Sequence, residues 1–101
     1  MLKRKTIITT REVYSYEGKP FFFEYTQDSK QTMLNLINYA IKDCKKGKGK
    51  FTVQVEEDGC SIKMEVGNDE EKKIILEVLE RAHIDILTAS GFDVLHDVVK
   101  S

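Results

Sequence analysis

The chain has 101 residues, of which 41% are hydrophobic and 33% charged, with a single proline and six glycines. This composition excludes a disordered or low-complexity chain and predicts one α+β domain over residues 1–101. Residues 1–50 carry 11 basic and 5 acidic side chains, whereas residues 51–101 carry 5 basic and 12 acidic ones. The formal net charge of −1 therefore conceals a dipole that can orient a charged partner or pair protomers head to tail.

The first ten residues contain a basic cluster, Lys3-Arg4-Lys5, but no apolar run long enough for a signal peptide or a membrane span. We therefore expect a cytoplasmic protein that makes no contact with a membrane. Cysteines in a chain without an export signal are usually reduced, so Cys44 and Cys60 are expected to be free thiols.

Aromatic and β-branched residues between Thr6 and Thr26 predict a first β-hairpin, with its turn at Gly18-Lys19. In that register one face of the hairpin is almost wholly aromatic, built from two cross-strand pairs: Tyr16 with Phe21, and Tyr14 with Phe23. Val13 and Phe22 then lie on the opposite face.

Apolar residues recur at helical spacing after this hairpin: Met33, Leu36, Ile37, Ala40, Ile41 and Cys44. Asp28 and Ser29 are suited to cap the start of a helix, and Gly47 is suited to end it. The pattern predicts a helix from about Ser29 to Lys46, whose last turn carries lysines that complement the helix dipole.

The stretch from Phe51 to Val66 alternates apolar and polar residues around Asp58-Gly59, a sequence that favours a two-residue type I′ turn. This turn fixes the register of a second hairpin. Its expected apolar pairs are Val55 with Ile62, Val53 with Met64 and Phe51 with Val66. The expected polar pairs are Gln54 with Lys63 and Thr52 with Glu65.

Asn68 and Glu71 have the spacing of a capping box, so a second helix is expected to begin near Asn68. It either continues to Ala89 or breaks near His83, because Ile84-Asp85-Ile86 also fits a short strand. Ser90 is then expected to cap a short last helix with an apolar stripe: Phe92, Leu95, Val98 and Val99.

The predicted order is ββα-ββα-α. It favours an α+β two-layer sandwich, in which two β-hairpins form one antiparallel sheet and the helices pack on one face. Exposed sheet edges are commonly covered by a partner, so we expect a homodimer with C2 symmetry that pairs through the aromatic hairpin or the last helix.

Lysines are densest between Lys42 and Lys50, where two glycines leave backbone N–H groups accessible. The spacing is not that of a P-loop, and no strand precedes it. A soluble connector at a helix end explains this segment, and contact with an anion, a nucleotide or nucleic acid is the alternative. The residues that would make that contact are Lys45, Lys46, Lys48 and Lys50. The alternative gains support if these lysines border the aromatic face and loses it if they point away.

The aromatic and apolar surface residues are better explained by protein contact than by base stacking, because no RNA-binding motif accompanies them. The predicted partner-binding residues are Tyr14, Tyr16, Phe22, Phe92 and Leu95. Acidic groups at Glu56–Asp58 and Asp69–Glu71 either mimic nucleic-acid phosphates or serve the local turn and helix start.

His83 and His96 lack metal-site spacing, and no nucleophile with a nearby base is recognisable, so neither an enzyme nor a bound metal or cofactor is expected. The sequence favours a small non-enzymatic protein-interaction module that binds a protein partner, of the kind that phages and mobile elements use as a regulator or inhibitor. The alternative is nucleic-acid or nucleotide binding through the segment from Lys42 to Lys50.

Overall fold

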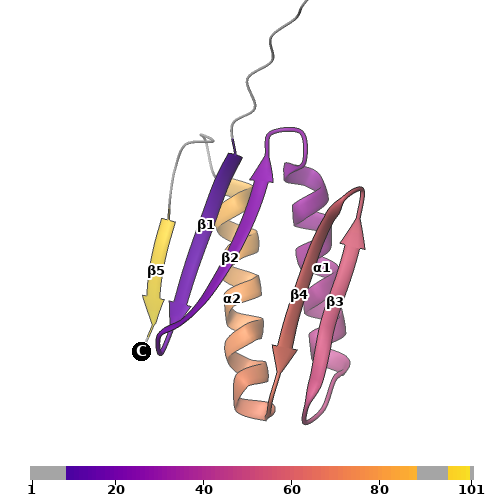
Figure 1. Cartoon of the computed structure of the whole chain (residues 1–101), viewed down its shortest axis with the longest axis vertical. Coiled ribbons are helices and arrows are strands. Elements are labelled where there is room, and N and C mark those ends of the chain that lie inside the picture. The colour runs from indigo at the N-terminus through magenta and orange to yellow at the C-terminus, as the bar shows by residue number, and fades with distance from the viewer. Residues whose placement is uncertain (1–8, 89–95, 101) are drawn as a thin grey trace, which may run out of the picture.

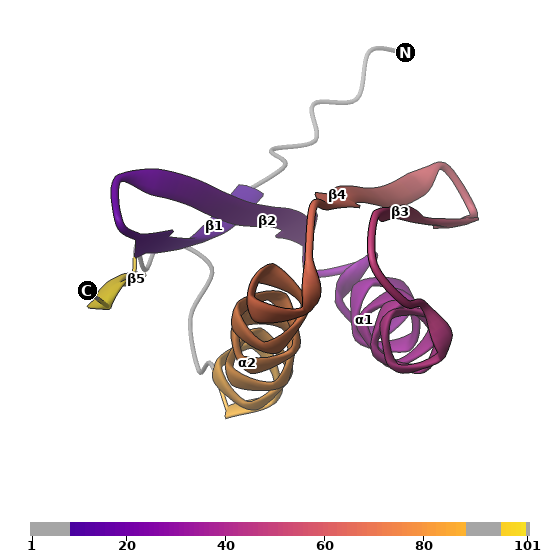
Figure 2. The ribbon, with the colours of Figure 1, turned by 90° about the horizontal axis from the view of Figure 1, so that it is seen from below.

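The computed structural model describes residues 9–88 and 96–100. Two β-hairpins lie side by side in one layer, and two antiparallel helices pack beneath them in a second layer (Figures 1 and 2). The α+β sandwich predicted from the sequence is confirmed. The elements in chain order are β1 (Thr9–Tyr16), β2 (Lys19–Thr26), α1 (Lys30–Lys46), β3 (Phe51–Glu57), β4 (Cys60–Val66), α2 (Asp69–Thr88) and β5 (His96–Lys100).

Hairpin β3–β4 has the register that its sequence predicts, from Phe51 opposite Val66 to Glu57 opposite Cys60. Asp58 and Gly59 form the turn with φ angles of 47° and 82°, the left-handed region that a type I′ turn requires. The alternation places Val53, Ile62 and Val66 in the core, so turn chemistry and hydrophobic pattern agree here.

Hairpin β1–β2 turns one residue earlier than predicted, at Glu17-Gly18, with φ angles of 49° and 79°. Tyr16 lies opposite Lys19 and Tyr14 opposite Phe21, so the predicted pairing is wrong. The alternation is unchanged, because the partners shift by two positions, and Val13 and Phe22 still share the opposite face.

Pro20 explains the earlier turn. In the predicted register Pro20 would lie opposite Glu17 in a hydrogen-bonded pair, which needs an N–H group that proline lacks. In the observed register Pro20 lies opposite Ser15, one pair beyond the turn-closing pair. Residues in such a pair direct their backbone groups away from the partner strand, so the missing N–H costs no hydrogen bond within the hairpin.

Helix α1 has the predicted bounds to within one residue. Ser29 occupies the N-cap position, but its hydroxyl accepts a hydrogen bond from the backbone N–H of Thr26 at 2.7 Å and none from the helix. Gly47 ends the helix and donates its N–H to the carbonyl of Asp43 at 3.3 Å.

Helix α2 begins after Asn68, whose side-chain oxygen accepts the N–H of Glu71 at 2.8 Å. The Glu71 carboxylate accepts the N–H of Gly67 at 3.2 Å, one residue before the position that a capping box uses. The helix runs without a break through His83 to Thr88.

The predicted last helix is wrong over residues 96–100, which form β5, a strand parallel to β1. Val98 and Val99 fit both a helical stripe and a strand, and β-branched side chains favour the strand. Phe92 and Leu95 lie outside the described residues.

The core lies between the layers, and α1 packs against both hairpins. Its fully buried side chains include Leu36 and Ile37 of α1 and Leu79 and Ile86 of α2. The strands form two separate hydrogen-bonded sheets, β2-β1-β5 and β3-β4, in place of the one predicted continuous sheet. One edge of β2 and one edge of β4 therefore remain without a strand partner among the described residues.

Candidate functional site

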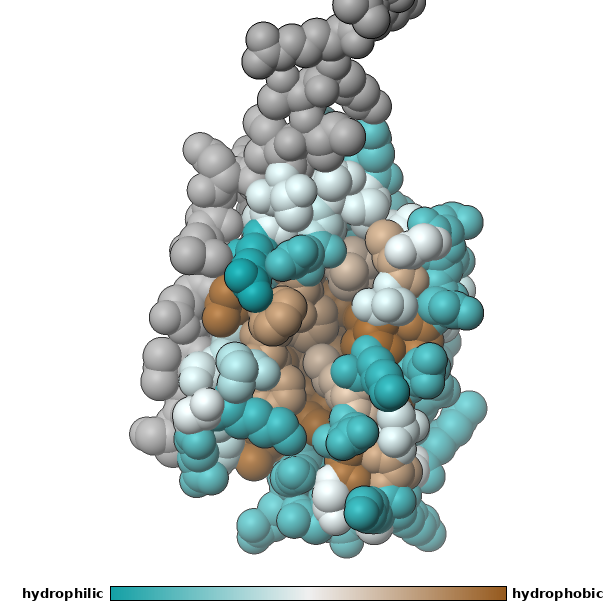
Figure 3. Space-filling view, in the orientation of Figure 1, coloured by the Kyte–Doolittle hydropathy of each residue, from teal (hydrophilic) through white to brown (hydrophobic). Residues whose placement is uncertain are grey.

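The unpaired edges of β2 and β4 lie side by side over the helix layer (Figure 1), and residues of both strands line one groove. It has a volume of about 480 Å³ and is lined by Pro20–Glu24, by Gly59–Met64 and by Met33 of α1. On the surface it appears as an apolar hollow between hydrophilic rims (Figure 3). We call it the β2–β4 groove.

The hairpin registers determine which backbone groups point into this groove. In a hairpin with a two-residue turn, the pair of residues that flanks the turn is hydrogen-bonded. Non-hydrogen-bonded and hydrogen-bonded pairs then alternate along the strands, and residues in the non-hydrogen-bonded pairs direct their N–H and C=O away from the partner strand. On β2 these outward residues include Phe22 and Glu24, and on β4 they include Ser61 and Lys63. Within residues 9–88 and 96–100, no backbone hydrogen bond joins β2 to β4.

The floor of the groove is apolar. Phe21 and Phe23 of β2 and Ile62 of β4 are buried, and Met33 of α1, only 4% exposed, lies beneath them. Met64 is half-buried and continues the apolar surface. The groove therefore combines unpaired backbone groups at its sides with a hydrophobic base.

The rim on the β2 side carries an aromatic ring with a cation over it. Phe22 is 51% exposed, and the guanidinium carbon of Arg11 lies 4.2 Å from the centre of its ring. Arg11 Nε is also 3.3 Å from a carboxylate oxygen of Glu24. On the β4 side, Ser61 and Lys63 are exposed.

The predicted partner-binding residues are separated by the fold. Tyr14 is 2% exposed and packs edge to face on Phe23, so it belongs to the core. Tyr16 is half-buried, and Phe22 lies on the rim of the β2–β4 groove. Of the predicted partner-binding residues that the structure describes, Phe22 is the one with a largely exposed side chain.

Tyr14 ties the first hairpin to α2. Its hydroxyl donates to Asp85 Oδ2 at 2.8 Å, and Asp85 also lies 3.2 Å from Arg81 Nε. Burial, together with the hydrogen bond to this carboxylate, raises the pKa of Tyr14 well above its usual range. The role of this contact is structural.

Tyr25 makes a second buried polar contact, donating its hydroxyl to Glu12 Oε1 at 3.4 Å. Burial and the neighbouring Glu12 raise the pKa of Tyr25 to about 12. Both phenols therefore favour their neutral forms in the folded protein.

The basic segment meets the acidic start of α2 at one end of the molecule. Lys72 Nζ donates to the carbonyls of Lys45 at 3.0 Å and Gly47 at 2.7 Å, which satisfies the C-terminal end of α1. The N–H of Gly49 donates to Asp69 Oδ1 at 3.4 Å. The basic segment, residues 42–50, and the acidic start of α2 are thus neighbours in space.

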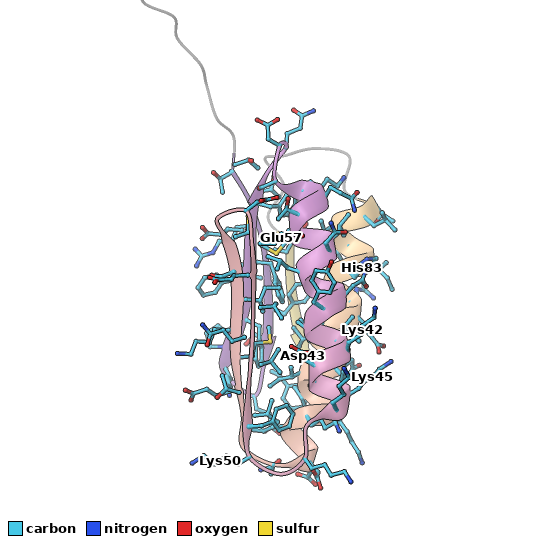
Figure 4. The ribbon with its side chains drawn as sticks, turned by 90° about the vertical axis from the view of Figure 1, so that its right-hand side faces the viewer. Lys42, Asp43, Lys45, Lys50, Glu57 and His83 are labelled. Carbon is cyan, nitrogen blue, oxygen red and sulfur yellow. The ribbon has the colours of Figure 1, made fainter. Side chains whose placement is uncertain are left out.

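The lysines proposed for anion binding are exposed: Lys45, Lys46, Lys48 and Lys50. Lys42 and Lys45 project from α1 on the side away from the hairpins, and Lys50 lies at the lower end of the second hairpin (Figure 4). Phe22 is exposed on the outer face of β2, so Lys42 and Lys45 lie on the opposite side of the molecule from the exposed aromatic ring.

Both cysteines are free, as predicted. Cys44 is fully buried, and burial raises the pKa of its thiol, whereas Cys60 is half-buried and lines the β2–β4 groove. Among the described residues no group of three or more His, Cys, Asp or Glu side chains is placed to hold a metal ion.

Sequence reasoning missed the β2–β4 groove. Pro20 is the one local signal, because proline is confined to strand edges and bulges. Nothing in the sequence of β4 shows that its edge faces that of β2, since this depends on how the helices space the two hairpins.

Comparison of the chain with protein-family models, with curated proteins and with solved structures finds no match. Neither of the described helices is long and apolar enough to cross a membrane.

Proposed function

We propose that this protein is a small protein-interaction module that binds an extended segment of a partner protein in the β2–β4 groove. The observation that carries the proposal is the pair of unpaired strand edges facing one another above an apolar floor. By occupying that segment of its partner, the module acts as a regulator or inhibitor without catalysis.

Strand addition explains both properties of the groove. A guest strand gains backbone hydrogen bonds from the edges, and alternate side chains enter pockets beneath it. The strand residues that line the groove are Pro20–Glu24 of β2 and Cys60–Met64 of β4, which matches a guest segment of about five residues. Because β2 and β4 run in opposite directions (Figure 1), the guest is parallel to one and antiparallel to the other.

Peptide panning tests the proposal. A phage-displayed library of random ten-residue peptides is panned on the wild-type protein, and the affinities of the enriched peptides are then measured for two proline variants. Lys63→Pro removes an N–H directed into the groove, whereas Gln54→Pro removes one directed to the outer edge of β3. Gln54 and Lys63 are exposed and lie opposite one another in the same pair, so the control is closely matched.

We expect enriched peptides that alternate apolar and polar residues and lose roughly tenfold or more in affinity for Lys63→Pro but not for Gln54→Pro. Enrichment without alternation, equal losses in both variants, or no enrichment contradicts the proposal. If Lys63→Pro does not fold, the wild-type protein provides the test. Bound peptide must slow maleimide labelling of Cys60, and unchanged labelling is then the contradicting result.

A further inference from the structure

We infer that the partner segment carries an acidic side chain at the centre of the β2–β4 groove, between two apolar residues. This inference rests on the proposed strand addition and adds the chemistry of the guest. It follows from the different surroundings of the two faces of a strand placed in the groove.

Side chains of an extended guest point alternately inward and outward. The inward positions lie above Met33, Phe23 and Ile62, which are buried and apolar, and a charge placed there would lose its hydration without a partner. The inward residues are therefore apolar, and the outward residue between them lies at the level of the rim.

Lys63 is the cation among the residues that line the groove, and Arg11 of β1 lies beside the β2 rim. Lys63 projects from β4 and, within the described part of the chain, forms no ion pair within 4.0 Å. On the β2 side the guanidinium of Arg11 covers the ring of Phe22. An outward residue at this level has Lys63 as a cross-strand neighbour, and opposite charges in such a pair stabilise the sheet.

The acidic residues near the rim do not remove the preference for an acidic side chain in the guest strand. Glu24 is already paired with Arg11, and Glu65 is the next outward residue along β4, beyond the part of that strand that lines the groove. A basic guest residue would meet the unpaired ammonium of Lys63, whereas a carboxylate would complement it. The charge selects the partner more than it strengthens binding.

The test pans the same peptide library on three proteins: the wild type, Lys63→Glu and Lys42→Glu. Lys42 is exposed on α1, on the side away from the hairpins, so its variant changes the net charge equally without touching the groove (Figure 4). We expect apolar-acidic-apolar peptides from the wild type and from Lys42→Glu, and apolar-basic-apolar peptides from Lys63→Glu. A peptide selected on the wild type should bind Lys63→Glu about five- to tenfold more weakly. Changing the peptide's acidic residue to lysine should restore that binding.

The possible failures are distinguishable. If the selected peptides alternate but show no charge preference, or show the same preference on all three proteins, the inference of an acidic guest residue is wrong. The proposal of strand addition is then unaffected. Peptides without alternation overturn both the inference and the proposed function.

Discussion

Hairpins β1–β2 and β3–β4 share a turn geometry, with positive φ at both turn residues and glycine second, yet they bury different chemistry. The first buries aromatic rings and two phenol hydroxyls, of which Tyr14 donates to Asp85 of α2 and Tyr25 to Glu12 of the same hairpin. The second buries aliphatic side chains, Val53, Ile62 and Val66. Local turn rules therefore produce the same hairpin twice, while side-chain chemistry determines how each is held to the helices.

The comparison also shows why the molecule has a groove. Each hairpin satisfies its own inner hydrogen bonds and is anchored by the shared helix layer. Neither hairpin needs the other's edge to form. The spacing between β2 and β4 is therefore set by packing on the helices, which leaves both edges for a guest strand.

The largest expected effect comes from Leu36, a fully buried residue of α1, the helix that supports both hairpins. Leu36→Ala should lower the free energy of unfolding by about 3 kcal/mol, because it leaves a cavity in a close-packed core. Urea unfolding measures the loss, and amide exchange should show both hairpins weakened together. A β3–β4 hairpin that keeps its protection would show that the two units fold independently.

High pH should affect the first hairpin through Tyr25. Its pKa is about 12 in the folded protein and about 10 in the unfolded chain. The neutral phenol therefore contributes its full share to the free energy of unfolding below pH 10, and this share is lost as the pH rises toward 12. The loss expected from Tyr25 alone is on the order of 2 kcal/mol, and Tyr14, whose pKa is also raised by burial, adds to the total. Urea unfolding at pH 9 and pH 11.5 measures it.

Tyr25→Phe is the control for this titration. The variant should reduce the dependence of stability on pH in this range, because one shifted phenol is removed. An identical pH dependence in wild type and variant would show that Tyr25 does not carry the effect.

The two turn glycines should have similar effects. Gly18 and Gly59 have φ angles of 79° and 82°, and a Cβ on either would meet no atom within 4 Å, so only backbone strain opposes alanine. Gly18→Ala and Gly59→Ala should each cost about 1 to 2 kcal/mol, measured by thermal unfolding. A cost at Gly59 alone would contradict the shared turn geometry.

The smallest effect is expected at Glu17, which has a φ of 49° in the first turn position. Asparagine tolerates this region better than glutamate, so Glu17→Asn should stabilise the protein by roughly 0.5 kcal/mol. Differential scanning calorimetry would detect the rise in melting temperature. A lower melting temperature would indicate that the Glu17 side chain stabilises the protein by more than its positive φ destabilises it.

Much of the fold was predictable because its signals are local. Asp58-Gly59 and the alternation around it specified the register of β3–β4, and helical spacing gave α1 to within one residue. The register of the first hairpin was not predictable from the residue types of its turn alone, because it depends on Pro20, which has no N–H for a turn-closing pair.

The candidate site was less predictable. The sequence places Phe22 and Tyr14 on opposite faces of the first hairpin. It does not show which of the two faces is buried against the helices, and the structure shows that Tyr14 is buried and Phe22 exposed. The edges of β2 and β4 come from segments far apart in sequence, and their separation depends on helix packing. Strand β5 was missed because Val98 and Val99 fit two periodicities over a short segment.

Amide hydrogen exchange of the free protein, measured by NMR at single residues, tests the split sheet most directly. We predict fast exchange at Phe22, Glu24, Ser61 and Lys63, comparable to Gln54 on the outer edge of β3. Phe21, Phe23 and Ile62, in hydrogen-bonded pairs, should exchange slowly. Slow exchange at Phe22 and Lys63 would show that the two edges are already paired, and would contradict a groove open to a partner strand.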